Sequence, residues 1–517
     1  MKPAFKIFLA AAVLFAVSCH KDDDNTSDDD LQEEAHYINN KPEDEEPVIL
    51  NNREVLAGIV EGVSENAKFL IEQGARNGDW LNGEYYTCSF SYPSTTADGQ
   101  PVWLTGRMAW PKEGEAKNII VGCHSTITDN VSCPSMSRAP LSDCGILSAI
   151  FASNSLVVCP DYEGFGSTAD RPQAYLCQEA TARQVVDAVI AAKKELVNRH
   201  KCELAYGSKM VVVGYSQGGA VAMAVQKYLE LGFGGKKPMA DDLNFMGSVC
   251  GAGPYDPLTT LKHYVKNDRM FLPAVMPLIV NGYCENNPLL RGAYKPEDFF
   301  NADFLNSGIL NWFRDKTLTT TEILQKLCDY SIDHTKGISD YEVSSDEPRF
   351  SMYAQVDLRP DAVVSRTDGY IEMNAENEQY YIWRTTPGSR YAPLSLTFKK
   401  SLLNYLKDKP AASDAETILV NVIESNNLLT GWKPAHPFVV FHSKHDEVVP
   451  FVNYENAKAS FGSSEMFHGV VYDTRTAQKH IEVGHVFFAV YLVNYVYPIL
   501  SNKPYELEHE VTLDGMF

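Results

Sequence analysis

The chain has 517 residues, of which 44% are hydrophobic and 11% aromatic, so it is long and apolar enough to bury a large core. Its formal net charge is −22 and no stretch gathers lysine and arginine, which argues against nucleic acid as a partner. The length suits two or three domains, or one enzyme core with a large insertion.

The chain begins with Lys2 and Lys6, followed by an apolar run that ends in AVSC. This run is too short and wrongly flanked to span a membrane, and it indicates a secretory signal. The ending resembles the lipobox of bacterial lipoproteins. That resemblance implies that residues 1–19 are a signal peptide, that Cys19 is lipidated, and that the mature chain is an extracytoplasmic, membrane-anchored lipoprotein. The alternative is an ordinary signal peptide with an incidental cysteine.

Residues 20–47 carry twelve Asp and Glu residues against Lys21 and Lys41. Such a segment has little apolar area to bury, so it predicts a disordered, self-repelling acidic tether. A lysine and acidic run behind a lipid-bearing cysteine also resembles the surface-export signal of some Gram-negative lipoproteins, which implies exposure on the outer-membrane surface. A plain solvated spacer would have the same composition.

The next elements indicate an α/β protein. Residues 53–75 have helical periodicity, and residues 85–111 alternate around DGQP as a hairpin would. Buried-strand patterns follow at 118–123, 155–160, 209–214 and 244–250, and residues 178–200 form an apolar helix face between the second and third of these. Strands that alternate with helices predict a mostly parallel sheet covered on both sides.

The alternation stops at about residue 255. Residues 255–415 are rich in Tyr, Phe, Asn and Pro, with helical fragments at 319–330 and 394–406, and we interpret them as a mainly helical cap insertion. Their apolar stretches 271–280 and 310–313 could line an acyl pocket or form the core of the cap. Strand patterns return at 437–443 and 466–473, followed by an apolar helix at 483–500. The predicted core is therefore 48–254 together with 416–517.

Residues 210–220, MVVVGYSQGGA, place a serine between a buried strand and a helix. At such a turn the serine takes a strained backbone conformation, and Gly214 and Gly218 remove the Cβ atoms that would collide around it. This is the pattern of a nucleophile elbow, which makes Ser216 the candidate nucleophile.

A serine hydroxyl needs a base and an acid that holds that base. In enzymes with such an elbow the acid and then the histidine follow the serine along the chain. Asp446 comes directly after a strand and is the candidate acid. His480 lies in the loop after the last strand and is the favoured base, with His485 as the alternative. His442 and His445 precede the acid and are interpreted as bystanders.

The anionic tetrahedral intermediate of acyl transfer needs two backbone N–H donors. Gln217 follows the nucleophile at the start of a helix and predicts the first donor. The second is expected from the segment His124-Ser125-Thr126 after an early strand, through the N–H of Thr126 or of Ser125.

These motifs together resemble the α/β-hydrolase superfamily and, more narrowly, the secretory lipase and esterase group. The resemblance covers roughly residues 85–260 and 425–500 and rests on five stretches: HST (124–126), CPDYEGFGS (159–167), GYSQGG (214–219), CGAGPYD (250–256) and HSKHDEVVPF (442–451). The family usually has HGT where this chain has HST, so Ser125 replaces a glycine. In DYEGFGS we expect Asp161 to bind loop backbone groups.

The resemblance implies a serine esterase or lipase that works through an acyl-enzyme and needs no cofactor and no metal. Its substrate would be a small-molecule ester or an ester carried by a polysaccharide. Two alternatives are a serine peptidase on the same fold and a catalytically silent surface binding lipoprotein. The ordered set of Ser216, Asp446 and a histidine disfavours the silent binder.

Overall fold

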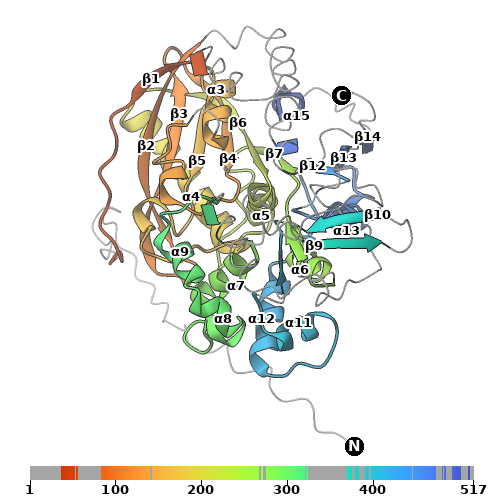
Figure 1. Ribbon diagram of the computed structural model, residues 1–517. Helices are drawn as coiled ribbons and strands as arrows, with labels where there is room; N and C mark the ends of the chain where they lie inside the picture. Colours follow the sequence, from red (N-terminus) through yellow and green to blue (C-terminus); the bar gives the residue numbers. More distant parts are fainter. Residues whose placement is uncertain are drawn as a thin grey trace, which may run out of the picture. The chain divides into compact units, whose positions relative to one another are not determined.

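A ten-stranded sheet, counted over the described residues, forms the centre of the computed structural model (Figure 1). The neighbours within it follow the order β1-β2-β3-β5-β4-β6-β7-β12-β13-β14. Their bounds are β1 Val48–Asn51, β2 Glu84–Thr95, β3 Pro101–Pro111, β4 Ala116–Cys123, β5 Leu156–Pro160, β6 Leu204–Tyr215, β7 Phe245–Gly251, β12 Phe438–Ser443, β13 Phe467–Tyr472 and β14 Glu510–Thr512. The β1/β2, β2/β3 and β3/β5 pairs are antiparallel, and the pairs from β5 to β14 are parallel. The predicted hairpin and the predicted mostly parallel sheet are therefore both present.

The structure describes only part of the chain. The described residues are 36–52, 54–55, 83–139, 142–266, 269–271, 275–320, 322–323, 326, 370–374, 379–383, 391–394, 397–444, 446, 448–472, 480, 483–484, 492–501 and 510–512. The signal peptide with Cys19, most of the two predicted helices at 53–75 and 319–330, His445 and His485 lie outside them.

Helices cover both faces of the sheet because the side chains of each strand alternate. On β6, Met210 and Val212 pack in the cluster with α4 (Gln178–Asn198) and α5 (Gln217–Leu231). Val211, Val213 and Tyr215 pack on the opposite face with α3 (Asp143–Phe151) and α15 (Leu492–Ser501). This two-sided burial explains why the central strands appear in the sequence as continuous apolar runs.

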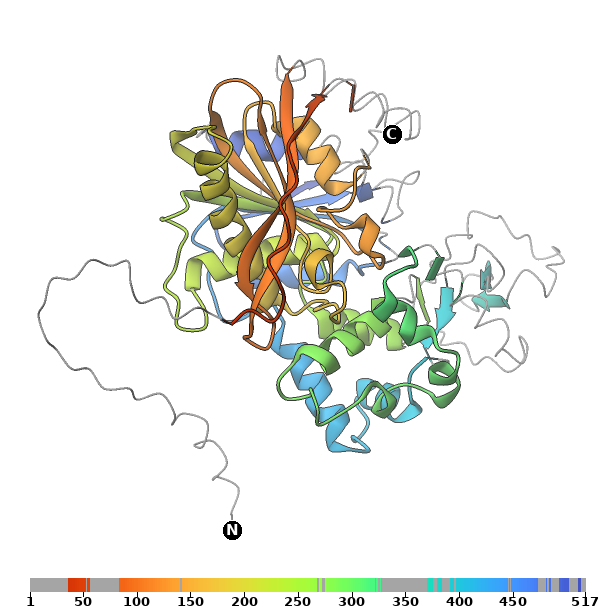
Figure 2. The same cartoon turned by 90° about the vertical axis from the view of Figure 1, so that its left-hand side faces the viewer.

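The described elements between β7 and β12 are mainly helical, and most of them gather at one end of the sheet (Figure 2). They are α6 Pro257–Lys266, β8 Arg269–Phe271, α7 Val275–Asn286, η4 Pro296–Asp298, α8 Ala302–Asn306, α9 Ile309–Asp315, β9 Tyr370–Asn374, β10 Gln379–Trp383, β11 Tyr391–Pro393, α11 Lys400–Leu406 and α12 Asp414–Ser425. The remaining described elements are η2 Asn130–Ser132, η3 Gly166–Thr168 and α13 Val452–Phe461.

The insertion has a hydrophobic cluster of its own. Met276, Ile279 and Phe313 are buried in it, so these members of the stretches 271–280 and 310–313 build the insertion's core. Leu419 and Ile423 of α12 belong to the same cluster. Helix α12 therefore spans the predicted boundary at residue 415, and we place the end of the insertion after Ser425.

The predicted tether 20–47 requires a correction at its second half. Tyr37 packs against Trp103 with ring centroids 4.9 Å apart, and the Ile38 N–H donates to the Pro101 carbonyl over 3.0 Å. Asn39 both donates to and accepts from the Trp103 backbone, over 2.9 and 2.8 Å. We call residues 37–47 the N-terminal strap.

Acidic side chains fasten the strap where composition alone predicts disorder. Asp44 accepts from the Ser91 backbone N–H over 3.1 Å and pairs with Arg199 over 2.9 Å. Glu45 accepts from the Ser89 N–H over 3.0 Å and contacts Arg107 and Arg138. The negative charges that repel one another in an isolated segment are thus offset by three arginines of the core.

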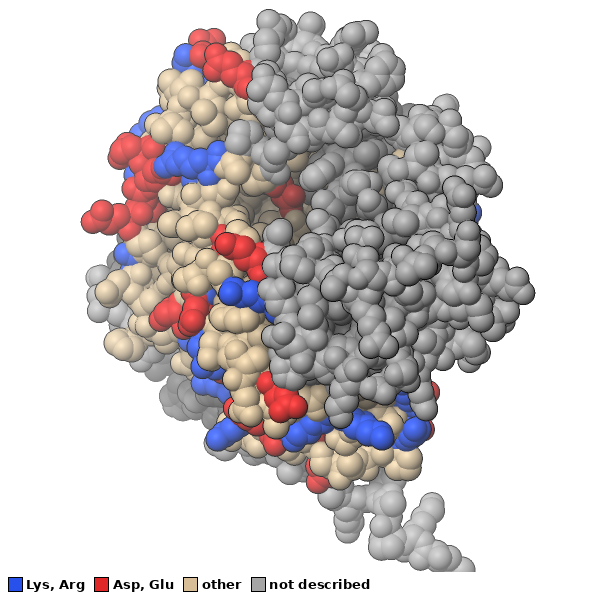
Figure 3. Space-filling view, in the orientation of Figure 1, with Lys and Arg blue, Asp and Glu red and all other residues tan. Residues whose placement is uncertain are grey.

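Neither a large basic surface in the view of Figure 3 nor a membrane-spanning helix is present in the described part of the chain. Lys and Arg are interspersed with Asp and Glu on the described part of the face in Figure 3, without a large basic area. None of the described helices is long and apolar enough to cross a bilayer.

Candidate active site

Ser216 lies between β6 and α5 in a backbone conformation that L-residues rarely adopt, with φ 58° and ψ −125°. Its N–H donates to the Gly251 carbonyl over 2.8 Å. A Cβ on Gly214 would collide with the Gly218 backbone, and one on Gly218 with the Cys123 carbonyl. Both glycines are therefore required for this turn, which leaves Ser216 half-buried at the end of the strand.

Asp446 follows β12 and is 8% exposed. Its Oδ1 accepts the backbone N–H groups of Val448 and Val449 over 2.9 and 2.7 Å. Its Oδ2 lies 2.6 Å from Nδ1 of His480. The loop thus satisfies one carboxylate oxygen and turns the other toward the histidine.

His480 lies beyond β13 and is 4% exposed. Its backbone carbonyl accepts the Tyr215 hydroxyl over 2.9 Å, and the two rings lie 5.0 Å apart. Because Tyr215 directly precedes Ser216, the structure brings Asp446 and His480 to the elbow. An Nδ1–H that donates to Asp446 leaves Nε2 as the basic nitrogen of the neutral ring.

The charge state of Asp446 follows from its neighbours. Burial raises the pKa of Asp446, but the charge of His480, its hydrogen bond, His442 and the Val449 N–H together outweigh burial, so the pKa lies below its ordinary value. Asp446 is therefore a carboxylate at neutral pH, the form that stabilises an imidazolium.

His442, expected to be a bystander, lies beside Asp446 and the loop that carries it. Its Nε2 lies 2.9 Å from the Val449 carbonyl and 3.8 Å from the Asp446 Oδ2. Burial lowers the pKa of His442, despite the nearby Asp446, and its ring is fully enclosed. A neutral His442 that donates to Val449 helps to fix the loop that carries Asp446.

The backbone N–H groups of Ser125 and Thr126, the two predicted sources of the second oxyanion donor, have different surroundings. The Ser125 N–H donates to the carboxylate of Asp143 over 2.7 Å, so it is engaged. Thr126, the next residue of this loop, is half-buried. A hydrogen bond of 2.8 Å between its hydroxyl and that of Tyr175 fixes its side chain. The Thr126 N–H has no acceptor among the described residues, in contrast to the Ser125 N–H.

Residues of the CPDYEGFGS stretch contact the segment that follows β4. Asp161 accepts from the Ser135 N–H over 2.7 Å and from the Thr105 hydroxyl over 2.6 Å, as expected for a residue that binds the loop. The Tyr162 ring stacks on His124 at 4.0 Å. Sequence reasoning missed Asp143, Tyr175 and Tyr215, because their partners lie far away along the chain and no local pattern marks them.

One family model matches part of the chain. Residues 141–323 match the model of the family described as secretory lipase. A search of curated protein sequences finds no match to the chain.

Three solved structures share the fold at low sequence identity. The rice cell wall degrading esterase LipA from Xanthomonas oryzae is 16% identical, with a TM-score of 0.57 and coverage of 89% of this chain and 96% of that one. A protein from Legionella pneumophila is 18% identical, with a TM-score of 0.58 and coverage of 90% of this chain and 100% of that one. Lipase A of Candida antarctica is 14% identical, with a TM-score of 0.54 and coverage of 83% and 81%. The chain has the α/β-hydrolase fold, and the family match supports a carboxylic ester hydrolase.

Proposed function

We propose that this α/β-hydrolase of the lipase and esterase type cleaves carboxylic esters through an acyl-enzyme on Ser216, with His480 as base and Asp446 as acid. The 2.6 Å contact between Asp446 and His480, held beside the elbow by Tyr215, supports this proposal most directly. It joins the carboxylate and the histidine that nucleophilic acyl transfer needs, and Tyr215 holds this pair beside the residue that follows it, Ser216.

In this mechanism His480 takes the proton of Ser216 as the serine oxygen attacks the ester carbonyl carbon. The N–H groups of Gln217 and Thr126 stabilise the oxyanion, and Asp446 stabilises the imidazolium. The intermediate collapses, the C–O bond to the alcohol breaks, and His480 donates its proton to the leaving oxygen. Water, deprotonated by His480, then attacks the acyl-enzyme, so that the acid leaves and Ser216 recovers its proton.

The test measures hydrolysis of nitrophenyl esters from acetyl to palmitoyl by the purified protein. Ser216→Ala and His480→Ala should each lower kcat by a factor on the order of 10⁴ or more, and Asp446→Asn by about 10³ to 10⁴. His485→Ala is the matched control and should retain activity. Loss of activity in His485→Ala with retention in His480→Ala would contradict the assignment of the base, and esters left uncleaved by folded wild-type protein would contradict the reaction.

We also propose that the chain acts outside the cytoplasm as a lipoprotein anchored through Cys19. The secretory lipase match supports the extracytoplasmic location, and the lipobox-like AVSC supports the anchor. Cys19→Ser should abolish incorporation of a labelled fatty acid into the protein. Its unchanged labelling would contradict the anchor.

A further inference from the structure

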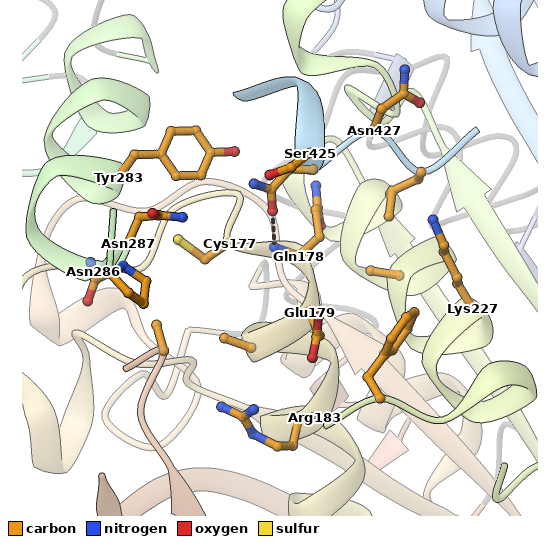
Figure 4. Close-up of a pocket in the computed structure, with 17 residues that line it drawn as sticks. Cys177, Gln178, Glu179, Arg183, Lys227, Tyr283, Asn286, Asn287, Ser425 and Asn427 are labelled. Carbon is orange, nitrogen blue, oxygen red and sulfur yellow. Dashed lines mark hydrogen bonds between the residues drawn. The ribbon is translucent and has the colours of Figure 1, made fainter. Parts of the chain in front are cut away.

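A polar pocket of about 380 Å³ lies beside the first turn of α4 (Figure 4). Its walls come from α4, α5, the end of α7 and the loop after α12. Lys227 on its wall stands about three turns, or about 16 Å, further along α5 than Ser216. The pocket is therefore separate from the catalytic centre.

Gln178 on this wall is a buried amide with unused hydrogen-bonding capacity. The residue is 3% exposed, and within the described part of the chain neither its Nε2 nor its Oε1 has a hydrogen-bond partner. Its backbone N–H donates to Asn426 over 3.0 Å, which fixes the residue at the start of α4. An unsatisfied buried amide costs about 1–3 kcal/mol, so a polar ligand that hydrogen-bonds to it would remove this cost.

Neighbouring polar groups on the wall also keep unused atoms. The Oδ1 of Asn427 accepts from the Leu429 N–H over 2.8 Å, and its NH₂ group makes no bond that the described residues show. Asn286 is the reverse case, because its NH₂ group donates to the Gly282 carbonyl over 2.9 Å and no described residue donates to its Oδ1. The first turn of α4 adds backbone N–H groups that have no acceptor within the helix. The pocket therefore offers both donors and acceptors.

This mixture selects among ligand classes. Arg183 and Lys227 disfavour a cation, and the carboxylate of Glu179 together with the amide oxygens disfavours a simple anion. An acyl chain would leave the amides unsatisfied. Hydroxyl groups both donate and accept, and the half-buried Phe233 provides apolar surface for the C–H groups of a sugar ring. The volume also falls in the range of small-molecule sites.

We propose that this pocket binds a saccharide unit. Such a site would hold a glycan chain against the same helix that carries the nucleophile at its start. Binding does not depend on ester hydrolysis, so the two functions can be tested separately.

The test titrates the full-length protein with cellobiose, xylobiose and mannobiose in a calorimeter, with sodium acetate and sodium phosphate as anion probes. We expect at least one disaccharide to bind with a Kd of about 1 mM or tighter. Gln178→Leu and Asn427→Asp should each weaken that binding by about tenfold, the effect of one lost hydrogen bond. Asn427→Asp keeps the oxygen that accepts from Leu429 and removes the donor.

The controls separate this site from the catalytic centre. Ser216→Ala should bind sugar as the wild type does, and so should Asn198→Asp, which changes an exposed amide at the far end of α4. Gln178→Leu should also raise Tm without sugar, because it removes an unsatisfied amide. The proposal is overturned if no disaccharide binds, if acetate or phosphate binds and the sugars do not, or if the two pocket variants bind as tightly as Asn198→Asp.

Discussion

The hydroxyl of Tyr215 donates to the backbone carbonyl of His480 over 2.9 Å, and the rings of the two residues lie 5.0 Å apart. Tyr215 is 3% exposed at the end of β6 and directly precedes the proposed nucleophile. The residue next to the nucleophile therefore positions the proposed base. This hydrogen bond links the elbow to a loop that lies more than half the chain away.

Tyr215→Phe should lower kcat by about tenfold with little change in KM, because a free His480 carbonyl loosens the base but not the substrate. The measurement is steady-state ester hydrolysis. Tyr228→Phe is the matched control, since Tyr228 is a buried tyrosine of α5 whose hydroxyl has no hydrogen-bond partner among the described residues. Equal kcat values for the two variants would show that Tyr215 does not position His480.

Asp143→Ala should lower kcat by about tenfold, because the Ser125 N–H loses its acceptor and the loop that presents Thr126 loosens. Ser125→Gly keeps both the N–H and its bond to Asp143, so we expect it to remain close to wild-type activity. Rates on one nitrophenyl ester compare the two variants. The larger loss in Ser125→Gly would argue against this assignment of the oxyanion donors.

His442→Gln should make stability less sensitive to acid. Burial lowers the pKa of His442 in the folded state, so the unfolded chain takes up this proton first as the pH falls below about 6.5. Wild-type stability therefore decreases below that pH, by a contribution that the glutamine variant lacks. Unfolding in urea between about pH 7.5 and 5 measures the difference, which should shrink with falling pH. A constant difference would mean that His442 does not titrate on unfolding.

Glu45→Ala should lower Tm by about 2–4 °C, because it removes the acceptor of the Ser89 N–H and the partner of two arginines. Glu43→Ala changes an exposed carboxylate of the same strap and should leave Tm unchanged. Differential scanning calorimetry of both proteins decides between them. A similar Tm for the two would indicate that the strap contributes nothing to stability.

The sequence predicted the features whose causes are local. The elbow at Ser216 depends on glycines at fixed positions beside it, and the strand before Asp446 is a continuous apolar run. The choice between His480 and His485 depends on the backbone path of the loop after β13, which local periodicity does not determine. The structure brings His480 to Asp446, whereas His485 lies outside the described residues.

The remaining differences arise from contacts between distant parts of the chain. The composition of residues 20–47 predicted a disordered tether, because twelve Asp and Glu residues in one segment repel one another. The fold instead pairs Asp44 and Glu45 with arginines from β3 and from loops elsewhere in the chain. Likewise, nothing near Ser125 in the sequence shows that its N–H is taken up by Asp143.

At Ser216, the proposed nucleophile, the backbone conformation that the turn requires opposes stability. A positive φ costs an L-residue free energy that glycine would not incur, and the rest of the sheet has to supply it. Random substitution followed by selection for thermal stability would therefore favour glycine at this position. The proposed reaction needs the serine hydroxyl, so a glycine variant of this position should be more stable and inactive on esters.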